Sequence, residues 1–477
     1  MAGERQVRSL IAALCLCAAA AWARPGAAQI LGGLPGLPGG GLPGGILPPA
    51  ARDLPGRDAL PPRVRKPRAP VETPALPSVT GPVNSAVGVA RELADAPLSE
   101  VRRLTAERLL REHPEQVEAD DHGQPVVRGE VLRLEGDAAS VERLRQAGFS
   151  VRADDDLRPL GLHAQVIGLP RGVSAIEAVR RLRALDPGGQ YDFNHLYQES
   201  GVSTGGGGGT ASPAVDGRSL RIGMVDGSAA ADAPALARAR LTQRAFGPGG
   251  ARVTGHATAV ASLIVGWYGP FHGAAPGASL YVADVYGPTA AGGSAEAVAR
   301  GLAWLAQTGA PVVSISLVGP TNRLLEASVQ ALIARGRLVV AAVGNDGPAA
   351  PPLYPAGYPG VVAVTGVDAR DRVLPEAGRG THVDFAAPGS DMAAAGASGG
   401  FVSVRGSSFA APIVAGRLAA LASRASPAEA VAALGREAVD LGAPGPDPIY
   451  GRGLVGADIR TEPAAVGAGR TPLAANR

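Results

Sequence analysis

The chain has 477 residues, of which 46% are hydrophobic, and a formal net charge of +3. This length allows two or three domains, and the hydrophobic content is sufficient for at least one sizeable core, which excludes a fully disordered chain. The arginines are scattered along the sequence rather than gathered into a basic stripe. We therefore expect no nucleic acid and no anionic membrane as a partner.

Residues 1–28 are predicted to be a secretory signal peptide. Arg5 and Arg8 precede an apolar run over residues 10–21, and residues 21–23 have the small-x-small pattern of a cleavage site. Because the run is shorter than the roughly 20 apolar residues that cross a bilayer, we expect no integral membrane segment after signal removal. The sequence predicts secretion to the periplasm or the extracellular space.

Both cysteines of the chain, Cys15 and Cys17, lie inside this predicted signal. The mature chain is therefore not expected to use a disulfide, a metal–thiolate site or a cysteine nucleophile. Residues 29–88 are dominated by glycine, leucine and proline and are predicted to be a flexible segment, because few of these residues form a packed face.

Residues 89–199 are predicted to form a small α+β domain. Its expected strands cover residues 126–134, 149–151, 165–169 and 190–197, and its helices begin near Asp137 and Ser174. This order is the split β-α-β (ferredoxin-like) arrangement. In the second helix Ser174 and Glu177 are expected to form a capping box, and Ile176, Val179 and Leu182 are expected to lie along one face.

A glycine-rich linker is predicted over residues 200–218, followed by a larger domain over residues 219–460 and a tail over residues 461–477. In the larger domain, short apolar strands alternate with helices, which indicates an α/β fold with a mostly parallel sheet covered on both faces. In such sheets reacting groups gather at the carboxyl ends of the strands. The expected strands cover residues 220–225, 280–285, 312–317, 338–342 and 361–367, and two of the expected helices cover residues 294–307 and 324–334.

Three polar residues lie at such strand ends or helix starts, and each has a structural alternative. Asp226 ends the first strand, where an acid is often a helix cap. His256 begins a helix of small apolar residues, where a histidine is often structural. Ser408 opens a second apolar helix, which favours negative charge at its first turn, and Gly406 leaves room for a substrate backbone, although a serine there is also a common cap.

Taken together, the segments around these residues resemble the subtilisin-like serine proteases (subtilases). Gly406-Ser407-Ser408-Phe409-Ala410-Ala411-Pro412 is similar to the Gly-Thr-Ser-Met-Ala-Ala-Pro of that family. The residues occur in the order Asp, His, Ser, as in that family. Further similarity covers residues 256–261, 273–278, 314–317, 344–345 and 386–389. Gly227-Ser228, Ala257 and Ser407 depart from the family pattern, and none of these departures removes a reacting group.

The resemblance implies a serine endopeptidase whose catalytic triad is Asp226, His256 and Ser408. Ser408 would attack the peptide carbonyl, His256 would transfer the proton, and Asp226 would orient the imidazole. Asn345 would donate to the oxyanion, although its turn-rich surroundings also suit a turn residue. The residues implied to line the substrate cleft are Ser316, Leu317, Val318, Gly319, Ala341, Ala342, Val343 and Gly344.

The implied chemistry requires no cofactor or metal. The resemblance leaves calcium binding open, because many members of the family bind calcium, but the sequence contains no acidic loop that identifies a site. Leu317 and Val318 offer no acidic group, so an apolar or medium-sized residue is expected before the cut. The partners implied are protein or peptide substrates and the chain's own residues 89–199, which resemble in pattern a propeptide that assists folding and blocks the cleft. Cleavage is expected between Tyr197 and Leu220.

Two other functions fit parts of the sequence. A catalytically silent binding module with the same fold is suggested by Gly227 and Ala257, which depart from the family pattern beside two of the reacting residues. A cell-surface protein is suggested by the glycine- and proline-rich residues 30–77, if that segment were the working part.

Overall fold

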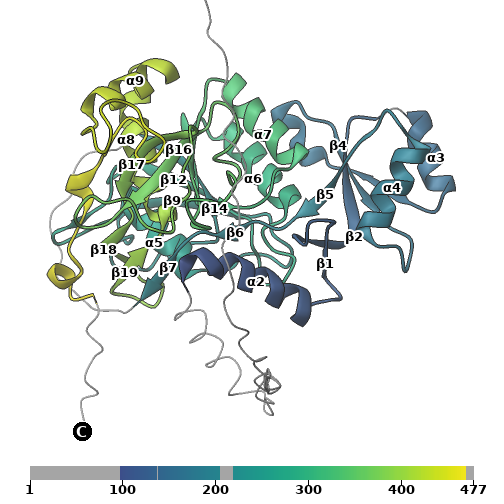
Figure 1. Ribbon diagram of the computed structural model, residues 1–477, viewed down its shortest axis with the longest axis horizontal. Helices are drawn as coiled ribbons and strands as arrows, with labels where there is room; N and C mark the ends of the chain where they lie inside the picture. Colours follow the sequence, from purple (N-terminus) through teal and green to yellow (C-terminus); the bar gives the residue numbers. More distant parts are fainter. Residues whose placement is uncertain (1–96, 137, 205–218, 469–477) are drawn as a thin grey trace, which may run out of the picture. The chain divides into compact units, whose positions relative to one another are not determined.

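The computed structural model describes residues 97–136, 138–204 and 219–468 (Figure 1). The predicted signal peptide, both cysteines and all of the predicted flexible segment lie outside these residues, as do most of the predicted linker and part of the tail. None of the helices formed by the described residues is long and apolar enough to cross a membrane.

The larger domain is built on a seven-stranded sheet whose neighbouring strands all run parallel. The predicted parallel sheet is therefore confirmed. In spatial order its strands are β17 (Val383–Pro388), β16 (Val362–Val367), β15 (Leu338–Ala342), β13 (Val312–Ile315), β8 (Arg221–Asp226), β12 (Ser279–Asp284) and β9 (Arg240–Ala245). β9 was not among the expected strands, because at the sheet edge its residues alternate between exposed and half-buried and form no apolar run.

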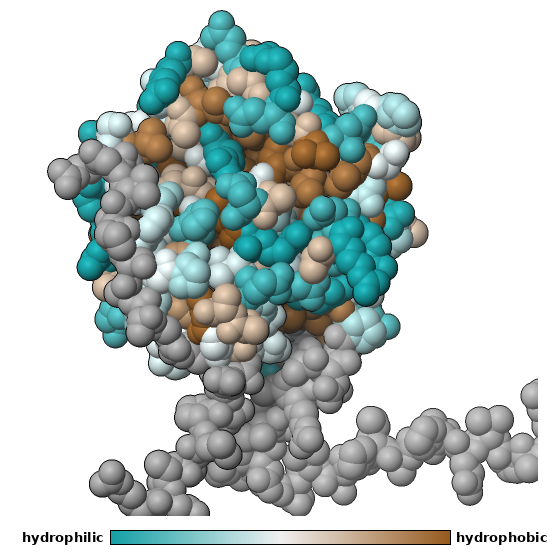
Figure 2. Space-filling view, turned by 90° about the vertical axis from the view of Figure 1, so that its left-hand side faces the viewer, coloured by the Kyte–Doolittle hydropathy of each residue, from teal (hydrophilic) through white to brown (hydrophobic). Residues whose placement is uncertain are grey.

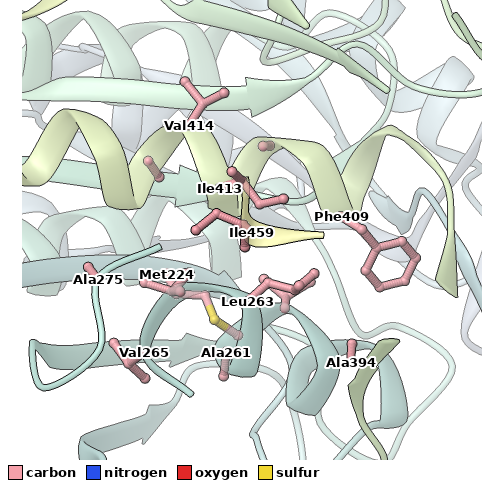
Figure 3. Packing of buried hydrophobic residues seen from close by; sticks show 14 of the residues in the cluster. Met224, Ala261, Leu263, Val265, Ala275, Ala394, Phe409, Ile413, Val414 and Ile459 are labelled. Carbon is pink, nitrogen blue, oxygen red and sulfur yellow. The ribbon is translucent and has the colours of Figure 1, made fainter. Parts of the chain in front are cut away.

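Helices cover both faces of this sheet. α5 (Gly255–Val265) and α8 (Ser407–Ala422) pack on one face, where Met224, Leu263 and Ile413 belong to the same hydrophobic cluster (Figure 3). α6 (Ala295–Gln307) and α7 (Arg323–Ala334) pack in a second cluster that contains Val225 and Val313. α5 and α8 are buried almost all round, which explains their content of small and apolar residues.

The C-terminal part of the domain adds α9 (Pro427–Glu437) and an antiparallel sheet in the order β18-β19-β7. The bounds of these strands are Ser390–Ala395, Phe401–Arg405 and Val202–Thr204. β7 lies within the predicted linker, so the first residues of that segment are paired strand. On the face shown in Figure 2, apolar patches are separated by hydrophilic side chains.

Residues 98–195 form a smaller unit with an antiparallel sheet. Its elements are α2 (Leu98–Glu112), β1 (Val117–Ala119), β2 (Pro125–Leu134), α3 (Ala138–Gln146), β3 (Ser150–Ala153), β4 (Ala164–Gly168), α4 (Ala175–Leu185) and β5 (Gln190–His195). The order from β2 to β5 is strand, helix, strand, strand, helix, strand, as expected from the sequence. Its grouping with the ferredoxin-like folds stays a prediction.

The helix α4 has the predicted cap at Ser174 but not the reciprocal half of the predicted capping box, because the Glu177 carboxylate binds Arg180 and Arg181. Ser174 caps α4 through the Glu177 N–H, but Ile176 is 44% exposed. The buried residues are Ala175, Ala178, Val179 and Leu182. These positions follow the i, i+3, i+4, i+7 stripe of one helix face, and Ile176 lies beside that stripe. Of the three residues expected along one face, Val179 and Leu182 are therefore buried and Ile176 is not.

The smaller unit packs against α6 and α7 of the larger domain, beside which it lies in Figure 1. The Arg152 guanidinium lies 2.9 Å from the Glu296 carboxylate, and the Glu296 N–H donates to Asn194 Oδ1 at 3.1 Å. Leu157 and Leu160 belong to the hydrophobic cluster that contains α6. Apolar contacts and charged hydrogen bonds thus hold the two units together.

Candidate active site

Asp226 is the last residue of β8 and lies at the carboxyl edge of the parallel sheet. Its side chain is 1% exposed, and each of its oxygens has a partner. Oδ1 accepts the Gly227 N–H at 2.7 Å, and Oδ2 lies 2.9 Å from Nδ1 of His256. The contact with Gly227 therefore orients the carboxylate toward the imidazole.

His256 lies in the first turn of α5. Thr254 caps this helix by accepting the Ala257 N–H at 3.0 Å, and the methyl group of Ala257 is fully buried without separating Asp226 from His256. The imidazole also packs against the Phe409 ring, with centroids 5.1 Å apart. Nε2 is buried and forms no hydrogen bond with any residue that the structure describes. This nitrogen is therefore free to accept a proton.

Two carboxylates determine the protonation of this imidazole. Burial alone would lower the pKa of His256, but the charges of Asp226 and Glu199, with the hydrogen bond that His256 donates to Asp226, outweigh burial and raise the pKa to about 9. Burial also raises the pKa of Glu199. Because an imidazole binds a proton more strongly than a carboxyl group does, His256 holds the proton within this group.

Ser408 lies in the first turn of α8, the helix that covers the same end of the sheet as α5. Its Oγ is buried and has no hydrogen-bond partner among the described residues. Ser316 Oγ donates to the Ser408 carbonyl oxygen at 2.9 Å. Because the first N–H groups of a helix have no partner within it, the start of α8 also offers donors to a negative charge.

Asn345 is held by α8 and bonds to the chain that leaves the smaller unit. Its Oδ1 accepts the Ser407 N–H at 3.1 Å, which directs its Nδ2 to the carbonyl oxygen of Ser200. Ser407, which stands in place of the threonine of the family pattern, also accepts the Gly344 N–H at 3.1 Å. The amide of Asn345 is thus oriented before any foreign substrate binds.

The chain that continues from β5 runs through this site as an extended peptide. β6 (Gln198–Glu199) pairs antiparallel with β14 (Leu317–Val318), and β7 pairs antiparallel with β19. Between these two strands lie Ser200 and Gly201. A Cβ atom added to Gly201 would lie 2.3 Å from Ser408 Oγ, so the Gly201 backbone directly contacts the serine hydroxyl. The strand predicted over residues 190–197 is shorter than expected, because β5 ends at His195.

Gly406 provides the space for this peptide. Its φ of 139° is a conformation that residues with a side chain rarely adopt. A Cβ atom at this residue would lie 2.6 Å from the Ser200 carbonyl oxygen and 2.8 Å from the Gly201 Cα. The glycine is thus required both by its backbone angle and by the approach of the peptide.

The predicted cleft residues divide into two groups. Leu317 and Val318 pair with β6, and Gly319 lies beneath the Tyr197 ring, to which an added Cβ would approach within 2.7 Å. Ala341 and Ala342 lie inside β15, which has a strand on each side, and Val343 is also buried. Pairing with the peptide is therefore made by β14, and β15 has no free edge for it.

The helix α2 also borders this peptide, which the sequence reasoning missed. Leu98, Val101 and Arg102 line the same cavity as residues 199–201. The Arg102 Nε donates to Asp346, the neighbour of Asn345, at 2.7 Å. A helix pattern in residues 98–112 could have been found from its apolar spacing, but its contact with Asp346 spans 244 residues of sequence.

Comparison with known proteins identifies the family. The sequence model of the subtilase family matches residues 247–453. Subtilisin Savinase of Lederbergia lenta is 35% identical over 214 residues, which make up 43% of this chain and 77% of that protein. The chain belongs to the subtilase family. Thermitase of Thermoactinomyces vulgaris is 36% identical to this subtilase over 170 residues, 35% of the chain and 60% of thermitase.

A solved structure agrees with the fold of this subtilase. Fervidolysin from Fervidobacterium pennivorans, described as a keratinolytic enzyme related to subtilisin, superposes with a TM-score of 0.60 at 20% identity. The match covers 72% of this chain and 62% of that one, and at this identity it bears on the fold alone. The resemblance inferred from the motifs is confirmed, and this subtilase is a serine endopeptidase of the subtilisin type.

Proposed function

We propose that Asp226, His256 and Ser408 are the catalytic triad of this endopeptidase and that its first substrate is its own chain, at the bond between Ser200 and Gly201. The observation that carries the proposal is the arrangement of that bond. The Ser200 carbonyl oxygen accepts from Asn345 Nδ2, while Gly201 contacts Ser408 Oγ. A carbonyl whose oxygen is held by a hydrogen-bond donor and whose next residue contacts a hydroxyl is well placed for nucleophilic attack.

In the proposed reaction, Ser408 Oγ attacks the carbonyl carbon of Ser200 and gives its proton to His256 Nε2. The C–N bond to Gly201 then breaks, and the imidazolium returns this proton to the Gly201 nitrogen. Water, deprotonated by His256, hydrolyses the ester and leaves a Ser200 carboxylate with free Ser408. We propose that the reaction uses only these side chains and the oxyanion donors, with no cofactor.

Two contacts support the proposed inhibition of the cleft by residues 89–199 before and after this cut. Gln198 and Glu199 pair with β14, the strand that would bind other substrates by addition of a peptide strand. The Tyr197 hydroxyl donates to the Pro320 carbonyl at 2.7 Å. Because both contacts involve residues 197–199, which precede the proposed cut, they would remain after cleavage.

We propose that the protein is secreted, on the strength of the N-terminal signal pattern. Among its relatives is a protein named minor extracellular protease Epr, of Bacillus subtilis, which is 32% identical over 42% of this chain and 32% of that protein. A reporter protein fused behind residues 1–28 should leave the cytoplasm of a bacterial host, and retention of the reporter in the cytoplasm would contradict the proposal.

Purified full-length protein is expected to cleave itself between Ser200 and Gly201. Intact-mass measurement and N-terminal sequencing of the large fragment should show a chain that begins at Gly201. The Ser408→Ala variant should stay whole under the same conditions. A first cut at any other bond would contradict the placement of the scissile bond, even if the protein is an active peptidase.

The cleaved enzyme is expected to accept small or medium uncharged residues before the cut in other substrates. The Ser200 side chain lies 3.5 Å from the Ser316 carbonyl oxygen, and Leu317 and Val318 present no acidic group to a basic side chain. A peptide library digested by the enzyme and read by mass spectrometry measures this preference. A majority of arginine or lysine before the cut would be the opposite result.

A further inference from the structure

Glu199, the residue before Ser200, lies against the reacting histidine. One carboxylate oxygen of Glu199, one of Asp226 and a ring nitrogen of His256 all lie within 4.8 Å of one another. Side chains alternate along an extended strand, so Gln198 points to the other face of β6. The backbone pairing of β6 with β14 thus holds one specific carboxylate beside the imidazole.

Most charges around Glu199 already have other partners. The Thr254 hydroxyl and Arg252 stabilise the Glu199 carboxylate, but Arg252 is exposed, so solvent screens its charge. The Arg102 guanidinium is bound by Asp346. The further titratable groups that line the cavities around Glu199 are Tyr197, Tyr286 and His113. The buried cation within reach of Glu199 is therefore the protonated form of His256.

This arrangement opposes the first step of catalysis. Only the neutral imidazole can accept the proton of Ser408, whereas each nearby carboxylate stabilises the charged imidazolium. Asp226 belongs to the catalytic domain and stays after processing, but Glu199 belongs to the segment that is cut. The effect of Glu199 on His256 is therefore specific to the state in which that segment occupies the cleft.

We propose that Glu199 restrains self-cleavage by keeping His256 protonated, so that the precursor needs a higher pH to cut itself than the freed enzyme needs to cut other peptides. The inference rests on the proposed function. Glu199 does not react itself; it is a positioning residue that acts through His256 by stabilising the protonated imidazole. The pKa of about 9 for His256, raised in part by Glu199, agrees with this role.

The direction in which pH changes the rate of self-cleavage follows from the role of His256 as the general base. Below the pKa of His256, the neutral fraction of the imidazole falls about tenfold for each pH unit, so cleavage slows as pH falls. Removing the Glu199 charge lowers the pKa of His256 and so moves the acid limb of the pH–rate profile, where the rate falls, to lower pH. A downward shift of about one pH unit corresponds to cleavage about tenfold faster at neutral pH.

The first experiment measures self-cleavage of the full-length precursor across pH 5 to 10 for wild type, Glu199→Gln and Glu115→Gln. Glu115 is an exposed carboxylate of the same unit and serves as the control. Glu199→Gln should move the acid limb down by about one pH unit, and Glu115→Gln should leave it in place. Glu199→Gln could instead slow cleavage at every pH without moving the acid limb of the pH–rate profile. This result would mean that Arg252 and Thr254 bind the Glu199 side chain as part of substrate recognition, and it would overturn the proposal that Glu199 restrains cleavage.

The second experiment measures the imidazole directly in precursor that cannot cleave. In the Ser408→Ala background, the ¹⁵N shifts of His256 report its protonation, and Glu199→Gln should lower the midpoint by about one pH unit. An unchanged midpoint overturns the role of Glu199 whether or not the wild type cuts itself. A lowered midpoint together with a wild type that never cuts itself would uphold the effect of Glu199 and count against the proposed self-processing.

Discussion

Replacing Ser408 by alanine is expected to lower peptide hydrolysis by a factor on the order of 10⁶. The loss results from removing the nucleophile: no acyl-enzyme forms, and the remaining oxyanion donors accelerate only direct attack by water. Turnover of a peptide substrate by the processed enzyme gives the reference rate. Because Ser408→Ala is expected to remain whole, both wild type and variant must carry a site for a second protease in residues 205–218 and be cut there, so that the two enzymes compared begin at the same residue.

A serine-directed fluorophosphonate provides an independent readout of the same prediction. Processed wild type should be labelled and Ser408→Ala should not. Ser423→Ala is a suitable control, because Ser423 lies just past the far end of the same helix and its exposed hydroxyl bonds only to the Ala420 carbonyl among the described residues. If folded, processed wild type resists the label, the chain is a silent binding module with a protease fold.

Replacing Asn345 by alanine is expected to lower the turnover number by about 10² to 10³. In the structure Nδ2 donates to the carbonyl oxygen of Ser200, where negative charge would develop during attack. An interaction that strengthens in the transition state appears in kcat more than in KM. Steady-state kinetics with a peptide substrate separates the two constants.

Ser408→Ala and Asn345→Ala are expected to differ in whether the enzyme can still react with a serine-directed label. Ser408 would remain in Asn345→Ala, so the fluorophosphonate should still label this variant, only more slowly. Asn345 Oδ1 also accepts the Ser407 N–H, and a melting temperature close to that of wild type would show that the start of α8 is intact. Losses of equal size in Ser408→Ala and Asn345→Ala, or a loss confined to KM, would contradict the role of Asn345 as an oxyanion donor.

The parallel sheet and the strand-end position of Asp226 could be predicted because they depend on local patterns. Strands buried on both faces are continuous apolar runs, and helices α5 and α8 are equally apolar because they are buried all round. The contact between Asp226 and His256 was expected only from the family resemblance, and the structure brings these side chains together at 2.9 Å. The changes at Gly227 and Ala257 do not disturb this contact.

The peptide in the cleft could not be predicted from local patterns. Residues 198–204 precede a glycine-rich run and resemble the start of a linker, and their strand character arises only because β14 and β19 offer free edges far away in the sequence. The role proposed for Glu199 could not be predicted for the same reason. Nothing near Glu199 in the sequence indicates that its carboxylate lies beside His256, 57 positions later.

The helix α2 influences the state of the protein after the cut. Through Arg102 it remains attached to Asp346, and the smaller unit remains docked on α6 and α7, so breaking one peptide bond removes none of these contacts. The proposed cut would change connectivity instead: the proposed inhibitor, tethered at a high effective concentration, would become a separate molecule. Dilution would then favour its release, so the onset of activity toward other proteins should depend on how concentrated the processed enzyme is.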